Sequence, residues 1–186
     1  SWGSGMARKD DGFGNTIAGH WFKPGIYNLN YALEKISYSQ KEQNVIIEVN
    51  EMATFENEVN SGFENKYIYT VKPTGEISIQ HSVIPCGNMP AWLPRIGVEW
   101  ILDKSMNKVN WYGRGPQENY PDRKSGYKMG TWTSTVDEMV VPYLIPQDYG
   151  NRTDVRYVKM TNTTGAGLIV EGDGFNFSAH PYSTDN

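Results

Sequence analysis

Residues 111–123 read Trp111-Tyr112-Gly113-Arg114-Gly115-Pro116-Gln117-Glu118-Asn119-Tyr120-Pro121-Asp122-Arg123, and alternating apolar segments lie on both sides of them. The two glycines tolerate backbone angles that a Cβ forbids, whereas the two prolines fix φ and favour extended conformations just before them. The stretch is therefore predicted to be a shaped loop, neither helix nor ladder strand. Its varied polar residues suit two roles equally: a rigid corner whose charges pair internally, or a loop that lines a site.

The composition describes a folded, turn-rich protein. The 186 residues include 13% aromatics, 19 glycines and 10 prolines, and disordered chains are poor in aromatics. A net charge of -4 without a basic stripe argues against a nucleic-acid partner. No apolar run is long enough for a membrane span, and Cys86, the single cysteine, excludes an internal disulfide or a zinc cluster. Residues 1–5 have the composition of a flexible leader or a cloning scar.

The segments around the central stretch are predicted to be strands. Apolar positions alternate in 45–49, in 96–102 and in 175–179. Two β-hairpins are expected, one from 67–71 and 76–80 around a Lys-Pro-Thr-Gly turn, with its second arm ending at Ile84-Pro85, and one from 155–159 and 168–171. Residues 103–107 suggest a turn, and 135–141 a short strand or one helical turn. Short strands separated by Gly/Pro turns predict one all-β domain over residues 6–186, an antiparallel sandwich or barrel.

Candidate catalytic groups are sparse. His20, His81 and His180 are far apart in sequence, no nucleophile elbow accompanies them, and metal-ligand spacing is missing. Glu118 and Asp122 are close enough in sequence to suggest the carboxylate pair of a glycosidase. However, arginines lower the pKa of a neighbouring carboxyl, the opposite of what a general acid needs, so structural ion pairs are the better interpretation. The aromatic, amide and charged side chains of the irregular stretches also suit sugar binding, although such aromatics are typical of a β-sheet core.

Several blocks of the sequence resemble one family. Residues 115–123, an unbroken Gly-Pro-Gln-Glu-Asn-Tyr-Pro-Asp-Arg, are similar to the signature of the C-terminal domain of glycoside hydrolase family 2 β-galactosidases, the β-galactosidase small-chain domain. Residues 142–156 resemble a second block of that domain, and residues 175–178 a third. Asp10-Asp11-Gly12-Phe13-Gly14 resembles the Asp-Asn-Asp-x-Gly loop that opens it, with departures at Asp11 and Gly12. The resemblance covers nearly everything after residue 5.

The resemblance implies a galactose-mutarotase-like β-supersandwich, a large antiparallel two-sheet domain that is here cut short at its C-terminal end. In such enzymes the catalytic glutamates lie in a separate (β/α)8 barrel, so no catalytic residue and no metal ligand is expected in this chain. Asp10, Asp11 and Gly14 would lie beside the substrate site. The resemblance implies mainly structural roles for the signature residues Gly115, Pro116, Glu118, Asn119, Tyr120, Asp122, Arg123, Gln147, Asn151, Arg152, Asp154 and Arg156.

The function implied is that of a non-catalytic domain of a β-galactosidase that hydrolyses terminal β-D-galactosides, such as lactose, by a retaining mechanism. The domain would pack on the catalytic barrel and help form the sugar site, and the chain alone would be inactive. Magnesium and sodium ions are the cofactors suggested for the parent enzyme, and none is expected in this chain. The bacterial cytoplasm and the periplasm are both open as its location. Unpaired sheet edges in a shortened sandwich suggest self-association.

Two alternatives stay open. A free-standing carbohydrate-binding module of the lectin type would bind galactose or lactose without a partner domain. A mutarotase-like enzyme would need a glutamate and a histidine that face one cleft.

Overall fold

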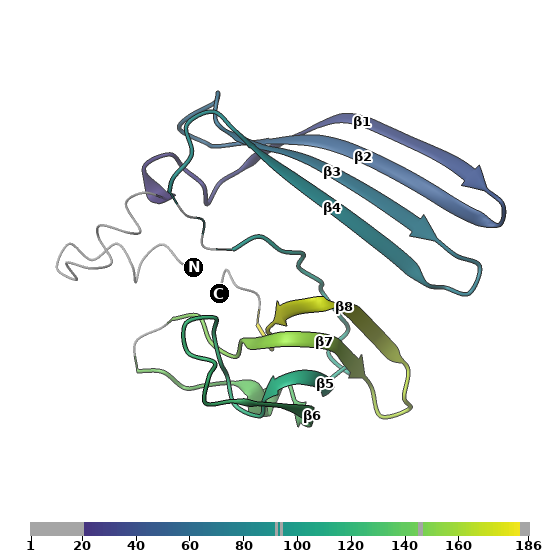
Figure 1. Cartoon of the computed structure of the whole chain (residues 1–186), viewed down its shortest axis with the longest axis vertical. Coiled ribbons are helices and arrows are strands. Elements are labelled where there is room, and N and C mark those ends of the chain that lie inside the picture. The colour runs from purple at the N-terminus through teal and green to yellow at the C-terminus, as the bar shows by residue number, and fades with distance from the viewer. Residues whose placement is uncertain (1–20, 92, 94, 145–146, 183–186) are drawn as a thin grey trace. The chain divides into compact units, whose positions relative to one another are not determined.

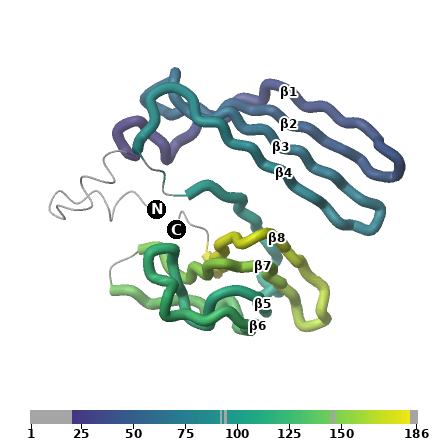
Figure 2. Tube along the Cα trace, in the orientation of Figure 1, coloured from purple at the N-terminus to yellow at the C-terminus, as the bar shows by residue number. Residues whose placement is uncertain are grey.

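The computed structural model describes residues 21–91, 93, 95–144 and 147–182. Contacts along the chain divide it into two compact units that meet in sequence between Gly97 and Val98. Each unit contains one antiparallel four-stranded sheet (Figures 1 and 2). The predicted all-β, antiparallel two-sheet class is therefore confirmed, whereas the single domain over residues 6–186 stays a prediction. No helix among the described residues is long and apolar enough to cross a membrane.

The first unit is a meander of four strands, paired in the order β1-β2-β3-β4. Their bounds are β1 Asn30–Lys41, β2 Asn44–Thr54, β3 Gly62–Val71 and β4 Ile77–Cys86. One end of the sheet is covered by loop residues of the same unit, and the core there consists of Ala53, Phe55 and Phe63 with Ile26, Leu29, Val83, Met89 and Leu93 packed against them. Phe55 and Phe63 contact edge to face, with ring centroids 5.6 Å apart.

The second unit pairs its strands in the order β6-β5-β7-β8. The elements are β5 Lys108–Gly115, β6 Lys128–Thr135, the 3-10 turn η1 Asp137–Met139, β7 Arg152–Thr161 and β8 Gly167–Phe177. Its core is Val109, Trp111, Val136, Met139, Val155, Val158 and Ala179, with Trp132, Met160, Val170, Phe175 and Phe177 packed against it. The helical turn that was one of two expectations for residues 135–141 is η1.

Both predicted hairpins are confirmed, and their turns share one geometry. Between β3 and β4, the Lys72 amide donates to the Glu76 carbonyl and the Gly75 amide to the Lys72 carbonyl. Between β7 and β8, the same pattern runs from Asn162 to Ala166 and from Gly165 to Asn162. The glycine of each turn has a left-handed φ, +87° at Gly75 and +88° at Gly165, which explains why a glycine stands there.

Three expectations about strands are wrong, and one strand was not predicted. Residues 96–102 alternate but form no strand among the described residues, while β1 exists although its mixed sequence did not predict it. Pro85 lies inside β4, which tolerates it because β4 is an edge strand and an edge strand has amides that need no partner. Residues 168–171 and 175–177 belong to one strand, β8, rather than to two.

The most informative correction concerns the central stretch, because residues 111–115 belong to β5 and are not a loop. Trp111, Gly113 and Gly115 are buried and alternate with more accessible residues, so the period of a strand is present. Neither glycine has a left-handed φ, and both are explained by space instead. A Cβ on Gly113 would lie 2.7 Å from Val155 Cγ2, and one on Gly115 would lie 2.8 Å from the Trp132 ring.

Candidate functional site

The two irregular stretches of the second unit come together beside the ends of β5 and β7. The Asn119 amide donates to the Asn151 carbonyl at 2.8 Å, and the Asn151 side-chain amide donates back to the Asn119 carbonyl at 2.8 Å. This reciprocal pair fastens residues 116–123 to residues 147–152, which lie about 30 positions later in the chain. The polar groups that the sequence singled out in both stretches are thus brought into one region.

Glu118 is the centre of this region, and we call it and its partners the Glu118 cluster (Glu118, Arg123, Tyr143 and Gly150). Only 8% of Glu118 is exposed. Its Oε1 accepts a hydrogen bond from Arg123 Nη2 at 2.7 Å and another from the Tyr143 hydroxyl. Its Oε2 accepts from the Gly150 amide at 2.8 Å. Both carboxylate oxygens are therefore engaged by donors of the same unit.

The balance of burial and hydrogen bonding sets the charge of Glu118. Burial on its own would raise the pKa of the Glu118 carboxyl, but the hydrogen bonds from Tyr143, Gly150 and Arg123 outweigh it and hold the pKa below its ordinary value. A general acid needs the opposite shift. Glu118 is thus ionised at neutral pH and forms an ion pair with Arg123.

Arg123 is positioned by a tight turn. The Arg123 amide donates to the Tyr120 carbonyl at 2.9 Å, and Pro121 occupies the turn's second position, which favours the φ of proline. The guanidinium lies over the Tyr120 ring, 4.7 Å from its centroid. Burial, together with the charges of Asp148 and Glu118, raises the pKa of Tyr120 to about 12, so its hydroxyl keeps its proton. Asp122, which directly precedes Arg123 in the sequence, is exposed at the tip of this turn.

Asn119 is completely buried and forms the second anchor of the stretch. Its Oδ1 accepts from the Thr153 amide at 3.0 Å and from the Thr153 hydroxyl at 2.5 Å. Its Nδ2 donates to the Gln117 carbonyl at 3.0 Å. Because buried polar groups are costly when unpaired, this amide fixes the loop to the start of β7.

Asp154 forms a third anchor at a β-bulge. The register of β7 with β8 shifts between Arg152 and Val155, and Asp154 has a left-handed φ of 55° there. Its carboxylate accepts from Lys124 Nζ at 2.8 Å and from Arg114 Nε at 2.5 Å. The Lys124 and Arg114 hydrogen bonds hold the pKa of Asp154 below its ordinary value. Arg114 also donates to the Lys124 and Tyr127 carbonyls, and these bonds attach the segment 116–127, called here the 116–127 excursion, to β5.

Arg152 is a buried cation with an unusual environment. It is 5% exposed, donates through Nη1 to the carbonyls of Gly150 and Asn151, and lies over the Trp111 ring at 5.2 Å. Burial lowers the pKa of its guanidinium, and the negative charge of Glu118 opposes this shift in part. Cation–π contact and backbone carbonyls thus replace a direct carboxylate partner.

The remaining predicted residues lie outside these anchors. Gln147 is exposed, and Arg156 forms an exposed ion pair with Asp173. Asp10, Asp11 and Gly14 lie outside the described residues. Sequence reasoning missed Tyr143, Gly150, Thr153 and Lys124, although the first three belong to the stretch that resembles the family's second block. Tyr143 and Gly150 both belong to the irregular stretch 142–152. That irregularity was the sequence feature that could have marked them as candidate site residues.

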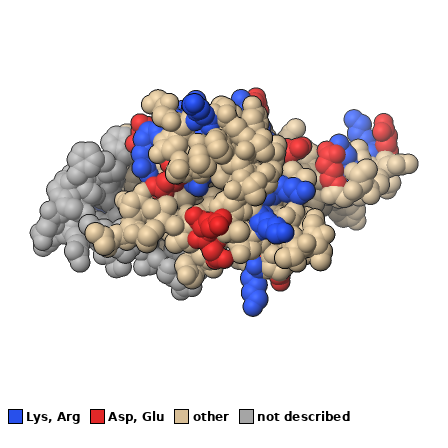
Figure 3. Space-filling view, turned by 90° about the horizontal axis from the view of Figure 1, so that it is seen from below, with Lys and Arg blue, Asp and Glu red and all other residues tan. Residues whose placement is uncertain are grey.

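The histidines of the described residues lie in different parts of the fold. His180 is an edge-to-face neighbour of Tyr149 in the second unit, His81 belongs to the first unit, and His20 lies outside the described residues. Within the described ranges, no three His, Cys, Asp or Glu side chains lie close enough together to hold a metal ion. Acidic and basic side chains both occur on the face shown in Figure 3. Three sets of polar contacts, centred on Glu118, Asn119 and Asp154, hold residues 116–127 in one defined conformation.

Comparison with known proteins identifies relatives of this chain. Residues 7–186 match the family model described as "Beta galactosidase small chain". The chain is 38% identical to a β-galactosidase of Priestia megaterium over 158 residues, which are 84% of this chain and 15% of that protein. It is 34% identical over 182 residues to a β-galactosidase of Pseudoalteromonas haloplanktis, covering 96% of this chain and 16% of that protein. It is 31% identical over 169 residues to a β-galactosidase of Vibrio cholerae, which are 91% of this chain and 16% of that protein. The chain thus spans about a sixth of the length of these relatives.

Proposed function

Because this chain belongs to the β-galactosidase small-chain family, we propose that it acts as a non-catalytic domain of a larger β-galactosidase. The parent enzyme hydrolyses terminal β-D-galactosides of the lactose type, as a retaining enzyme of glycoside hydrolase family 2. The domain packs on the catalytic barrel of the same polypeptide and shapes part of the sugar site. The observation that carries this proposal is the match of nearly the whole chain to one sixth of proteins named β-galactosidase.

The geometry of the signature supports a structural contribution. Glu118 has both oxygens engaged by hydrogen bonds and a lowered pKa, so at neutral pH it lacks the proton that a general acid needs. The anchors at Asn119 and Asp154 give the 116–127 excursion a fixed shape. A rigid surface of this kind suits a docking face between domains of one polypeptide.

A segment exchange tests the proposal. In the β-galactosidase of Priestia megaterium, the region that matches this chain is replaced by residues 7–186, and a second version lacks the region altogether. Release of a chromogenic aglycone should persist in the exchanged enzyme and be lost in the shortened one, while the isolated chain releases none. A shortened enzyme as active as the intact one would contradict the proposed role of the domain. Turnover by the pure chain would show that the chain itself is catalytic.

A further inference from the structure

The sheet of the first unit has one largely apolar face and one of mixed polarity, called here the polar face, which also carries Ile46, Met52 and Ile68. Directly opposed residues of antiparallel strands point to the same side, so the register assigns each row to a face. Glu48, Glu64 and Lys66 lie on the polar face, where Glu48 and Lys66 form an exposed ion pair. The apolar face carries Tyr31, Leu33, Ile36, Tyr38, Val45, Ile47, Val49, Ala53, Phe63, Tyr67, Tyr69, Ile77, Ile79 and Val83.

Each of the adjacent strands β2, β3 and β4 places one polar side chain on this apolar face. Glu51 of β2 and Asn65 of β3 are direct cross-strand partners, and His81 of β4 is the partner of Tyr67, one row further along. Asn65 Nδ2 donates to Glu51 Oε1 at 3.4 Å, and Asn65 Oδ1 lies 3.2 Å from His81 Nε2. The three groups therefore form one chain of hydrogen bonds that begins at a carboxylate and ends at an imidazole.

This chain of hydrogen bonds determines the protonation of His81. If Asn65 donates its amide to the carboxylate, its oxygen faces the imidazole, and Nε2 must carry the hydrogen. If the Asn65 side-chain amide were reversed, its oxygen would face the Glu51 carboxylate, and two acceptors would lie against each other without a hydrogen between them. Burial lowers the pKa of His81, against the opposing charge of Glu51, so the ring is neutral at pH 7. The Nδ1 atom of a neutral ring with a hydrogen on Nε2 is a hydrogen-bond acceptor.

The aromatic neighbours hold this imidazole in place. The His81 ring stacks on Tyr67 with centroids 4.1 Å apart, and Tyr67 stacks in turn on Tyr69 at 6.0 Å. Burial and the charge of Glu51 raise the pKa of Tyr31 and of Tyr67, so both hydroxyls keep their protons and can donate. Two acceptors, Glu51 and His81, are thus grouped with tyrosine hydroxyls on a surface that also offers aliphatic contacts at Val49 and Val83.

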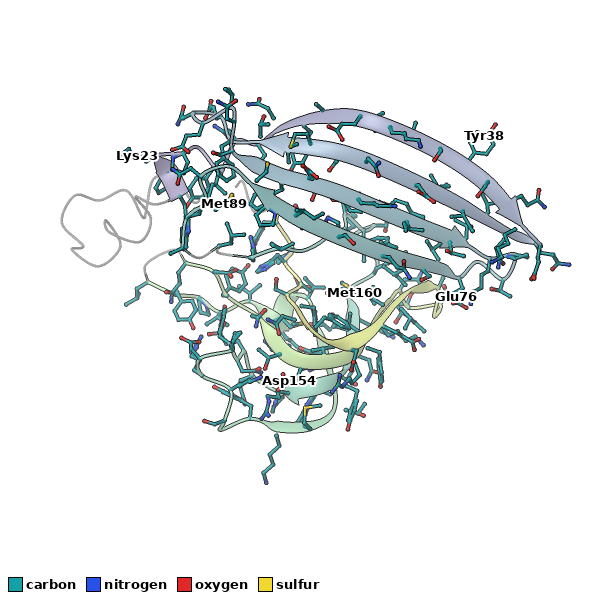
Figure 4. The ribbon with its side chains drawn as sticks, turned by 45° about the horizontal axis from the view of Figure 1, so that its top comes forward. Lys23, Tyr38, Glu76, Met89, Asp154 and Met160 are labelled. Carbon is teal, nitrogen blue, oxygen red and sulfur yellow. The ribbon has the colours of Figure 1, made fainter. Side chains whose placement is uncertain are left out.

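This group lies part-way along the sheet, and most of its members retain some exposure. It lies between the end of the sheet that loop residues cover and the end where Tyr38 is 85% exposed and extends from β1 (Figure 4). Asn65 is 8% exposed, whereas Glu51, Tyr67 and His81 are half-buried. A carboxylate and an imidazole under a purely apolar cover would lose hydration without compensation, which is costly. The group therefore fits a ligand that supplies hydrogen-bond donors.

We propose that Glu51 and His81, held by Asn65 and flanked by Tyr31 and Tyr67, form a saccharide-binding patch on the apolar face of the β1–β4 sheet. Neighbouring hydroxyls of a pyranose donate to the carboxylate and to His81 Nδ1, tyrosine hydroxyls donate to its oxygens, and its C–H face lies against the aliphatic side chains. The choice of a saccharide as ligand class rests on the proposed function. The patch lies in the first unit and is composed of other residues than the Glu118 cluster.

Nuclear magnetic resonance of the histidine rings tests the patch in the intact chain. Galactose is titrated while the ring signals of His20, His81 and His180 are followed, with the His81 signal assigned from a His81→Gln variant. We expect a saturable shift at His81 and none at the other two histidines. Glu51→Gln should weaken binding about tenfold, since a hydrogen bond to a charged group contributes about 1.5 to 3 kcal/mol. Glu48→Gln, on the same strand but the opposite face, should bind like the unaltered chain.

Three outcomes would overturn the patch. They are no saturable shift at His81 in the unaltered chain, an equal loss in Glu51→Gln and Glu48→Gln, or a larger His81 response to methylammonium, which would reveal a cation site. Tyr31→Phe removes only a hydroxyl from a 64% exposed side chain, so it provides a second weakened variant should Glu51→Gln unfold. A failed titration leaves the segment exchange unaffected, because that experiment measures hydrolysis by the parent enzyme.

Discussion

Arg123 and Glu118 form an ion pair across a tight turn, with 2.7 Å between Nη2 and Oε1, and their exposures are very different. The arginine side chain is 51% exposed and the glutamate side chain 9%. The arginine therefore gives up little hydration in this contact, while the carboxylate depends on its protein donors. Removing one partner of such a pair leaves the more buried charge under-solvated, which costs more than the pair itself contributes.

Arg123→Gln should destabilise the second unit through Glu118. Tyr143 and Gly150 still donate to the carboxylate, and the arginine is half exposed, so we expect a loss of about 1 to 2 kcal/mol in the free energy of unfolding rather than the larger cost of a fully buried pair. Urea unfolding followed by tryptophan fluorescence measures it. Asp122→Asn, at the exposed adjacent position, should stay within about 0.5 kcal/mol of the unaltered chain. Equal stability of the two variants would show that the ion pair is not structural.

The lowered pKa of Glu118 predicts how its contribution changes with pH. The group's ordinary pKa is 4.5, and its value in the folded state is lower. Above pH 4.5 it is ionised in both states and its stabilisation is complete. As the pH falls below 4.5 the unfolded state binds the proton first, and the contribution is lost as the pH falls through the folded-state pKa.

The stability difference between the unaltered chain and Glu118→Gln should therefore be constant from pH 7 down to about 5 and shrink below pH 4.5. Unfolding in urea at a series of pH values gives this difference directly. Tyr143→Phe removes one of the donors that depress the pKa, so its loss of stability on acidification should be shallower. A difference that grows on acidification would mean that Glu118 has a raised pKa and that its assignment here is wrong.

Asn119→Ala should lower the free energy of unfolding by more than the loss of a small side chain alone would. The substitution leaves the Thr153 amide and hydroxyl without their acceptor in a fully buried position. Each unsatisfied buried group costs about 1 to 3 kcal/mol, so we expect a total loss of about 2 to 6 kcal/mol in urea unfolding. Gln117→Ala, two residues away and exposed, should be close to neutral. Similar values for both variants would contradict the anchoring role of Asn119.

Local patterns predicted the two hairpins, because their alternating β-branched residues and their Gly-containing turns determine pairing between neighbouring segments. The end of β5 was hidden because Gly113 and Gly115 occupy inward positions where an apolar residue is expected. Strand β1 was hidden for another reason: it is an edge strand whose residues are mostly exposed on both faces, so burial imposes little pattern on them. Conversely, residues 96–102 alternate without a ladder, since alternation shows which side chains could be buried and not which strand is beside them.

The composition of the Glu118 region was predictable, but its pairings were not. Asp122 is the carboxylate next to Arg123 in the sequence, but the turn at Tyr120 directs the guanidinium back to Glu118. Tyr143, Gly150 and Thr153 reach the same region only because β7 lies beside β5. In the first unit, Glu51 and His81 are 30 residues apart in sequence, and only the register of β2, β3 and β4 places them on one face.

The open edges of the two sheets predict self-association. Strands β1 and β4 are the outer strands of the first sheet, and β6 and β8 those of the second. Unpaired edges pair with other chains unless charges oppose it. Light scattering should give a mass that rises with concentration, and Tyr38→Lys, on edge strand β1, should lower it. Tyr182→Lys replaces a tyrosine that is also exposed but outside the strands, and it should have no effect. A monomeric mass at all concentrations would refute the prediction.

Close packing of β5 on β7 makes Gly113 irreplaceable for reasons of space. An added Cβ would lie 2.7 Å from Val155 Cγ2 and 2.9 Å from Val155 Cα, and a backbone atom of a central strand cannot move away as a side chain can. Overpacking of this kind costs about 1 to 3 kcal/mol, so Gly113→Ala should lower the free energy of unfolding by that amount. Gly126→Ala is the matched control, because nothing lies within 4 Å of its added Cβ. Loss of glycine flexibility in the unfolded chain should leave that variant equal in stability or slightly more stable. If both variants lose stability equally, conformational freedom rather than space explains the glycine at 113.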